Sequence, residues 1–385
     1  MRTVRFGIIG CGMIGREFVS AAARWLHLPE MRVRPQIVAI CNRTLTAPKI
    51  DWFRDNIPTL RQITSNYREL LDNPDVEAVY VAVPHHLHAE IYLETLEAGK
   101  HLMGEKPFGI DRRANEAIVG GVRRHPELCV RCASQFFFFP AAQRIGRMIE
   151  SRAFGKIIEV NVGFLHCSDL NPDKPINWKR MCQLNGDYGC LGDLGPHACT
   201  LPFRAGWVPR NVRAVLSNII PSRPDGHGGA VPCETWDNAT LLCEMEDPDS
   251  GGVFPLTLRA HRISPGQRNN WYIEILGTAA SARYSLRQAN TLEVLEYHGG
   301  TEQQWRQIEM GQETAFRSIT QELAQFGVSD AILQMWAAYL YELDTGRPLS
   351  RFAGCTRPEE TTRWHELFTA ALESHATGRA VTIPR

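Results

Sequence analysis

Residues 4–15 read VRFGIIGCGMIG, a short apolar run that leads directly into three glycines spaced Gly-x-Gly-x-x-Gly. The run predicts a strand, and the apolar spacing in residues 16–26 predicts a helix after the glycines. Glycines at such a junction allow a tight turn and a close approach of the backbone to a pyrophosphate at the helix N-terminus. A turn that only packs strand on helix is the alternative, but the strand–turn–helix context favours a dinucleotide site. Cofactor contacts are therefore expected at Gly10, Gly12, Met13, Ile14 and Gly15.

Up to residue 135 the chain alternates between apolar strands and helices. The segments 37–41 and 78–83 are continuously apolar, as is typical of parallel strands buried on both faces. A helical stretch over 88–98 ends at Gly99, where a glycine commonly terminates a helix. This alternation predicts an α/β fold with a doubly wound parallel sheet in a first domain of residues 1–135.

The pattern changes in residues 136–385, which form the second predicted domain. Long strand candidates follow one another there, at 157–164, 212–219, 239–245, 254–261 and 271–276. Consecutive strands of this kind indicate an α/β domain with an open, mainly antiparallel sheet. Two helices are expected at 329–343 and 358–374, where they can pack back on the first domain.

Composition excludes several functions. The 385 residues contain 42 basic and 42 acidic side chains, so no overall charge attracts nucleic acid or an anionic membrane. No apolar run approaches the roughly 20 residues of a membrane span, and no signal-like segment precedes the first strand. The eleven cysteines are scattered and odd in number, which favours reduced thiols. We therefore expect a cytoplasmic protein without nucleic-acid or membrane partners.

The end of the second strand bears on cofactor choice. NAD sites usually carry an acidic residue there, which accepts a hydrogen bond from the ribose 2′-hydroxyl. This chain has Asn42 and Arg43 at that point and no acid. Arg43 can meet a 2′-phosphate, whereas Asn42 can serve a ribose hydroxyl. NAD and NADP both stay open, with the arginine favouring NADP.

Two later motifs carry reactive groups. Glu105-Lys106-Pro107 follows a short strand at 101–103, and Asp193 and His197 are four residues apart, which places both side chains on one face of a helix. The Lys106 ammonium can polarise a carbonyl or stabilise an alkoxide. The His197 imidazole titrates near neutrality and can accept and return a hydroxyl proton. Asp193 can bind substrate or orient the base; a helix cap with a packed histidine behind it is the alternative.

The order of these three motifs resembles the glucose–fructose oxidoreductase / inositol dehydrogenase / rhizopine-catabolism (Gfo/Idh/MocA) family over nearly the whole chain. The resemblance implies a Rossmann domain, a second domain with an open sheet, and homodimers or homotetramers formed through that sheet. It also implies that Lys106 lies beside the nicotinamide and that Pro107 follows a cis peptide.

The resemblance adds weaker positions. His85 stands where the family loop usually has asparagine, and Phe136, Phe137 and Phe138 replace a more cationic stretch. Three histidines within residues 85–88 suggest a metal, but they lack a carboxylate or cysteine partner, so no metal is predicted. Additional cofactor contacts are expected at Asn42, Arg43, Pro84, His85, His88, Glu105, Lys106 and Gln135. Substrate contacts are expected at Lys106, His166, Trp178, Lys179, Asp193 and His197.

These residues support an NAD(P)-dependent dehydrogenase or reductase of a sugar, glycoside or cyclitol. An alternative is an NAD-dependent glycoside hydrolase that oxidises, eliminates, hydrates and re-reduces its substrate. That chemistry needs a further base, with Asp169, His166 and Tyr188 as candidates. A non-catalytic nucleotide sensor is disfavoured, because it requires none of Lys106, Asp193 and His197.

Overall fold

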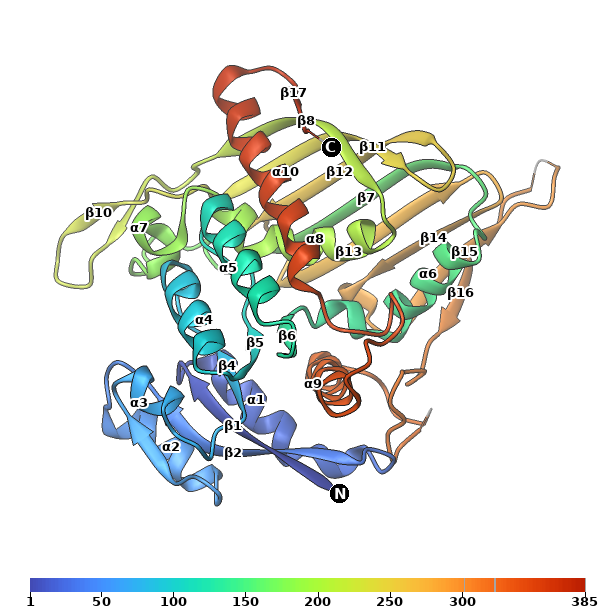
Figure 1. The fold of residues 1–385 in the computed structure, drawn as a ribbon. Helices are drawn as coiled ribbons and strands as arrows, with labels where there is room; N and C mark the ends of the chain where they lie inside the picture. The colour runs from blue at the N-terminus through green and yellow to red at the C-terminus, as the bar shows by residue number, and fades with distance from the viewer. Residues whose placement is uncertain (301, 322, 385) are drawn as a thin grey trace. The chain divides into compact units, whose positions relative to one another are not determined.

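The computed structural model describes residues 1–300, 302–321 and 323–384. Its contacts divide the chain into two compact units. The first contains Met1–Gly109, Arg113–Phe138 and Gln312–Glu359, and the second contains Ile110–Arg112, Phe139–Gly311 and Glu360–Arg385. Figure 1 shows the helices and strands of both units.

A six-stranded parallel sheet forms the centre of the first unit. Its order is β3-β2-β1-β4-β5-β6. The strands are β1 (Arg2–Ile9), β2 (Val33–Cys41), β3 (Gln62–Thr64), β4 (Ala78–Val81), β5 (His101–Gly104) and β6 (Val130–Cys132). The chain order reverses between β1 and β4, and ligands of such sheets bind beyond the carboxyl ends of the strands at this point. The glycine turn follows β1 directly, so the sequence motif lies at the switch point.

The helices of the first unit are mostly short and follow the strands. They are α1 (Met13–Ala23), α2 (Ala47–Asn56), α3 (Tyr67–Leu71), α4 (His88–Glu97), α5 (Arg112–Arg124) and α9 (Val328–Thr345). Helix α9 comes from the C-terminal part of the chain and packs on α1, with the Trp336 ring stacked on Phe18 at a centroid distance of 3.7 Å. Trp336 is 1 % exposed, so this contact belongs to the core of the unit.

A nine-stranded sheet forms the second unit, in the order β16-β15-β14-β13-β7-β12-β11-β8-β17. Only the β7–β12 pair among these strands is parallel. The strands are β7 (Ile157–His166), β8 (Val208–Ser217), β11 (Asn238–Asp247), β12 (Gly252–His261), β13 (Asn269–Gly277), β14 (Ala280–Ser285), β15 (Thr291–Glu296), β16 (Arg306–Glu309) and β17 (Val381–Thr382). A separate hairpin pairs β9 (Ser222–Pro224) with β10 (Ala230–Pro232).

One face of the large sheet is covered by helices. Helix α8 (Cys190–Arg204) packs on β7 and β12, and every residue of α8 is buried. The other helices of the unit are α6 (Pro140–Glu150), α7 (Cys182–Asn185) and α10 (Pro358–Thr377). Along β11 the buried residues alternate with the exposed Thr240, Leu242 and Glu244, so the opposite face of the sheet is open.

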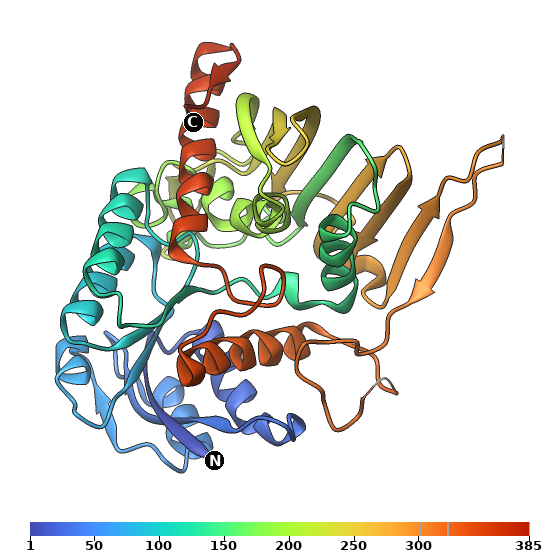
Figure 2. The same ribbon diagram turned by 45° about the vertical axis from the view of Figure 1, so that its right-hand side comes forward.

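The predicted fold class is confirmed: a parallel sheet is followed by a mixed, mostly antiparallel one. The neighbouring strands β14, β15 and β16 were not predicted, and in Figure 2 they are seen at one side of the large sheet. Their short sequences, interrupted by polar or charged residues, give no apolar run. The helix predicted at 16–26 instead begins at Met13 and ends at Ala23, because the glycine turn itself starts the helix. Within the described residues, no helix is long and apolar enough to cross a membrane.

Candidate functional site

The glycine turn is closely packed at two positions and open at the third. Gly10 has a φ of +110°, and a Cβ there would lie 2.1 Å from the carbonyl oxygen of Ala82. A Cβ on Gly15 would lie 2.4 Å from the carbonyl oxygen of Gly10, whereas a Cβ on Gly12 would meet nothing within 4 Å. Gly12 is the N-cap of α1 and gives the first turn no side-chain cap. The turn therefore fits a dinucleotide, whose pyrophosphate can accept from the uncapped N–H groups.

Asn42 connects this turn to the end of β2. Its Oδ1 accepts from the Cys11 backbone N–H at 3.2 Å, and its Nδ2 donates to the Thr44 carbonyl at 2.7 Å. Arg43 is exposed. Burial raises the pKa of the Cys11 thiol to about 12, so this cysteine is a neutral packing group in the turn. The side-chain amide of Asn42 thus holds the backbone of Cys11 and Thr44 in place. The Arg43 side chain extends into solvent at the end of β2.

Glu105 is held at the end of β5 by two tyrosines. Tyr80 Oη donates to Glu105 Oε1 at 2.7 Å, and Tyr92 Oη donates to the Glu105 carbonyl at 2.8 Å. Burial raises the pKa of both phenols well above the ordinary value, so both remain donors. The next peptide, Lys106–Pro107, is cis. Glu105 therefore acts as an anchor for the segment that presents Lys106.

The loop after β4 contains three histidines, and the side chains of two of them, His85 and His88, are buried. Pro84 precedes a short 3-10 helix at His85–Leu87, and His85 is 3 % exposed. His88 is fully buried, stacks on Tyr92 at 5.0 Å, and its Nε2 lies 3.0 Å from the Val83 carbonyl oxygen. These contacts support the loop. Across the described residues no group of three or more His, Cys, Asp or Glu side chains is arranged to hold a metal ion.

Asp193 and His197 lie one turn apart on the buried helix α8. Each is 4 % exposed. The carbonyl oxygen of His197 accepts a hydrogen bond from Trp271 Nε1 at 2.8 Å. The imidazole ring of His197 packs edge-on against the Phe164 ring, with their centroids 5.3 Å apart. Trp271 of β13 thus holds the main chain at His197, and Phe164 of β7 packs against the imidazole.

Two cations bind the Asp193 carboxylate. Lys179 Nζ lies 2.7 Å and Arg262 Nη2 lies 3.2 Å from the same oxygen, Oδ2. Lys179 belongs to the 3-10 helix η4 (Trp178–Arg180), and its Nζ lies 5.7 Å from the centre of the Trp178 ring. Arg262 directly follows β12 and is 2 % exposed. The charges of Lys179 and Arg262 thus offset the negative charge of the Asp193 carboxylate.

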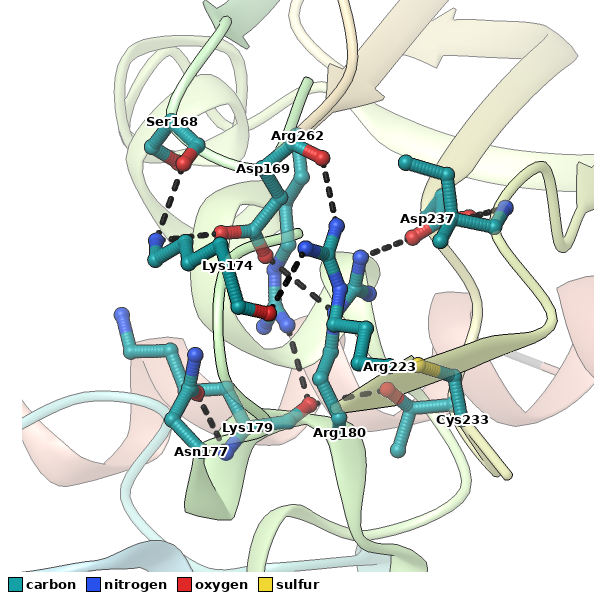
Figure 3. A network of polar contacts seen from close by, with 12 residues as sticks. Ser168, Asp169, Lys174, Asn177, Lys179, Arg180, Arg223, Cys233, Asp237 and Arg262 are labelled. Atoms are coloured by element: carbon teal, nitrogen blue, oxygen red, sulfur yellow. Dashed lines mark hydrogen bonds and ion pairs between the residues drawn. The ribbon is translucent and has the colours of Figure 1, made fainter. Parts of the chain in front are cut away.

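A buried ion network lies beside Lys179 and Arg262 (Figure 3). The fully buried Arg180 pairs with Asp237 and, through Nε at 3.2 Å, with Asp169. Lys174 Nζ lies 2.6 Å from the other oxygen of Asp169. Burial alone would raise the pKa of Asp169, but the Lys174 hydrogen bond and the charges of Arg180, Lys174 and Arg262 outweigh it and lower that pKa.

The β9–β10 hairpin closes this network. Arg223 is 1 % exposed and donates to the carbonyl oxygens of Asn171, at 2.7 Å, and Asp169. The hairpin therefore holds the loop between β7 and η4, which carries Asp169 and Lys174. Residues 169–180, 223 and 237 are brought together only by the tertiary fold.

The candidate bases for a hydrolytic reaction have other roles here. Asp169 is paired with Lys174 and Arg180, as described above. Tyr188 Oη lies 2.7 Å from Thr369 Oγ1 and 3.3 Å from the His365 carbonyl oxygen, and burial raises its pKa to about 12. His166 ends β7, where its ring lies 4.5 Å from that of Phe164.

The sequence gives no signal for Asp237 and Arg223, and it indicates Arg262 only as a plausible polar group of the pocket, together with His166 and Asp169. Asp237 directly precedes β11 and Arg223 lies in the small hairpin, far from every motif. No spacing rule relates these residues to Asp193. One usable signal comes from β12, in which buried and exposed residues alternate. An arginine that directly follows such a strand is a candidate for pairing with a buried carboxylate.

Known proteins match both parts of the chain. The family model described as "oxidoreductase family, NAD-binding Rossmann fold" matches residues 4–130, and the "GFO/IDH/MocA C-terminal domain" matches residues 142–283. The chain belongs to the Gfo/Idh/MocA oxidoreductase family. The resemblance drawn from the three motifs is confirmed, and the chain is an oxidoreductase with an NAD-binding Rossmann domain.

Individual relatives include two dehydrogenases. Levoglucosan dehydrogenase of Pseudarthrobacter phenanthrenivorans is 28% identical over 311 residues, which cover 76% of each chain. Trans-1,2-dihydrobenzene-1,2-diol dehydrogenase of Sus scrofa is 28% identical over 244 residues, or 60% of this chain and 68% of the relative. The solved structure of levoglucosan dehydrogenase in complex with NADH and L-sorbose superposes with a TM-score of 0.87 at 24% identity, covering 100% of both chains. This structural likeness shows the fold.

Proposed function

We propose that the protein transfers hydride between a nicotinamide cofactor and a secondary hydroxyl or ketone of a sugar, glycoside or cyclitol. The observation that carries the proposal is the pairing on α8. Asp193 is bound by Lys179 and Arg262, and His197 follows one turn later. A carboxylate neutralised by two cations is a weak base, so the imidazole takes the role of proton acceptor. The levoglucosan dehydrogenase relative supports a carbohydrate substrate.

Each residue has one role in this mechanism. Lys106 polarises the ketone oxygen in reduction and stabilises the alkoxide in oxidation. His197 removes the hydroxyl proton in oxidation and returns it in reduction. Asp193 and Lys179 orient the substrate hydroxyls, and Trp178 offers an aromatic face to the sugar ring. The glycine turn would hold the pyrophosphate of the cofactor, whose nicotinamide would accept the hydride in oxidation and donate it in reduction.

The end of β2 favours NADP over NAD. The segment 42–46 contains no acidic residue, and Arg43 is exposed. Lys49 contributes positive charge, because its field acts on the Cys11 thiol in the glycine turn. A 2′-phosphate would find cations here and no repelling carboxylate. Arg43→Ala is expected to lower kcat/KM for NADP more than for NAD.

The open face of the nine-stranded sheet is the proposed surface for self-association. It exposes Leu242 of β11, Val253 of β12 and Val215 of β8, which are 53%, 48% and 54% exposed. Strands β8, β11 and β12 are neighbours, so these side chains lie on one continuous sheet. A homodimer or homotetramer would cover them, and analytical ultracentrifugation measures which form is present.

The test is a substrate panel. Purified protein is given levoglucosan, other sugars, cyclitols and aryl glycosides, each with NAD and with NADP. Nicotinamide absorbance and aglycone release are followed in parallel. The proposal expects net reduced nicotinamide without release of aglycone. Aglycone release with no net change in nicotinamide would instead establish redox-neutral hydrolysis, and turnover of neither kind would reject both.

A further inference from the structure

We propose that Arg262 is a positioning residue, which orients Asp193 and fixes the main chain that carries Lys179. The proposal rests on the function proposed above. It concerns a residue outside the three sequence motifs, contributed by the segment that follows β12. Arg262 acts through Asp193 and Lys179, and is given no contact with substrate.

Arg262 binds three separate points with one guanidinium group. Nη2 lies 3.2 Å from Asp193 Oδ2 and 3.5 Å from the carbonyl oxygen of Gly189, and Nη1 lies 2.9 Å from the carbonyl oxygen of Lys179. Gly189 is the N-cap of α8. A single rigid fork therefore ties η4 to the first turn of α8, and the planar geometry of the guanidinium sets the relative position of all three.

The arginine is itself held firmly. Its backbone N–H donates to the Asp237 carbonyl oxygen at 2.9 Å, and Asp237 pairs with the buried Arg180. Thr235 Oγ1 donates to the same Lys179 carbonyl oxygen at 2.8 Å. Figure 3 shows Arg262 between the Lys179 carbonyl and the Asp169–Arg180–Asp237 group. Arg262 therefore transmits the rigidity of the buried ion network to Lys179 and Asp193.

A lysine cannot reproduce this arrangement. Lysine carries the same charge but donates from one point, so it can neutralise Asp193 without also holding the carbonyl oxygens. A glutamine keeps polarity and loses the charge. Because both Arg262 and Lys179 bind the same Asp193 oxygen, loss of Arg262 removes one of the two cations that orient the carboxylate.

The kinetic test is a double-mutant cycle. Arg262→Gln, Asp193→Asn and the double variant are compared with wild type in the oxidation of a sugar that turns over in the panel, with NAD and NADP. We expect R262Q to lower kcat by about 10- to 100-fold with a smaller change in KM, since misplacement affects the reacting geometry. We expect R262K to recover part of kcat, and R262Q to cost less than about three-fold in the D193N background. Multiplicative effects of the two substitutions would overturn the proposal.

Arg204→Gln is the matched control. Arg204 is also buried, at 4 % exposed, lies on the same helix, and pairs with Glu360 at 3.0 Å. It is eleven residues from Asp193, which is about 16 Å along a helix. R204Q disrupts the pair between a buried arginine and a partly exposed carboxylate without touching Asp193. An equal loss of kcat in R204Q would show that general destabilisation, and not positioning, explains R262Q.

A second measurement does not depend on turnover. Hydrogen exchange by mass spectrometry is followed in the segments 177–182 and 189–194 of the full-length protein. R262Q is expected to speed exchange there by at least about ten-fold relative to wild type, and R204Q to leave both segments unchanged. Unchanged exchange in R262Q would reject the positioning role even if the panel shows no activity. Inactive wild type with faster exchange in R262Q would instead reject the proposed function alone.

Discussion

The two units assemble their polar sites in different ways. In the first unit, Gly10, Gly12 and Gly15 shape a turn within six residues, and Glu105 is fixed by tyrosines of neighbouring elements. In the second unit, Asp193 is bound by Lys179 and Arg262, which are far apart in the sequence. The first site depends on backbone geometry, the second on buried charge. The substitutions that damage each unit should therefore differ in kind.

The largest expected effect follows from Lys106. Lys106→Met keeps the length of the side chain and removes its charge, so the oxygen loses its electrophile. Removing a preorganised charge of this kind costs about 10²- to 10³-fold in kcat. Dinucleotide binding, measured by quenching of tryptophan fluorescence, is expected to stay within about two-fold of wild type, because the glycine turn is untouched. Full activity in K106M would remove Lys106 from the mechanism.

The buried charges of the second unit should control stability. Arg180→Met leaves Asp169 and Asp237 buried without their shared cation, which costs about 3–5 kcal/mol. The comparison is Arg68→Met in the first unit. Arg68 is 55% exposed in its side chain and pairs with Glu90 and Glu94 on the surface, so its loss should cost far less stability than the loss of Arg180. Urea unfolding measures the free energy of unfolding of both variants. Equal losses of stability in R180M and R68M would contradict the distinction between buried and surface charges.

Substitutions at two glycines of the turn should affect different properties, one the stability of the fold and the other the binding of the dinucleotide. Gly10→Ala puts a Cβ against the Ala82 carbonyl oxygen at a positive φ, which costs about 1–3 kcal/mol of stability. Gly12→Val meets nothing within 4 Å of its Cβ, so the apo protein should melt as wild type does. It should still weaken dinucleotide binding, because its side chain occupies the space above the turn. A lower melting temperature in G12V than in G10A would contradict this.

A smaller, pH-dependent effect is expected at Asp169. Its pKa is lower in the folded protein than the ordinary value, despite burial, because Lys174, Arg180 and Arg262 favour the charged form. The carboxylate therefore stabilises the fold above about pH 4, and this stabilisation is lost as the pH falls through the folded-state pKa. Asp169→Asn should be less stable than wild type near pH 7.

The difference in the free energy of unfolding between wild type and D169N should become smaller at acidic pH. Urea unfolding of wild type and D169N from about pH 7 down to about pH 3 measures it. Lys156→Gln is the control, because Lys156 is exposed and its substitution leaves the pH dependence unchanged. A constant difference across this range would mean that the Asp169 charge does not contribute.

The sequence predicted local features well and distant pairing poorly. Each strand of the parallel sheet is indicated by a short apolar run, and the glycine turn is indicated by its glycines. Each of these signals lies within a single short segment of the sequence. Strands β14, β15 and β16 depend on neighbouring strands for their hydrogen bonds, so their own residues give a weak signal.

The site in the second unit shows the same limit. The four-residue spacing of Asp193 and His197 indicates a shared helix face, which α8 provides. The pairing of Asp193 with Arg262 depends on how β12 ends beside α8, and no local pattern encodes that contact. Charged residues are usually exposed, so the burial of Arg180, Arg223 and Arg262 could not be read from their type.

The most direct test of the central claim follows the hydride itself. A sugar that turns over in the panel is prepared with deuterium at every carbon, and the nicotinamide product is analysed by mass spectrometry after a single turnover. Hydride transfer predicts one deuterium in the reduced nicotinamide and a ketone at one carbon of the sugar. Reduced nicotinamide without deuterium, or a sugar that is altered while its deuterium passes only to solvent, would contradict hydride transfer as the reaction.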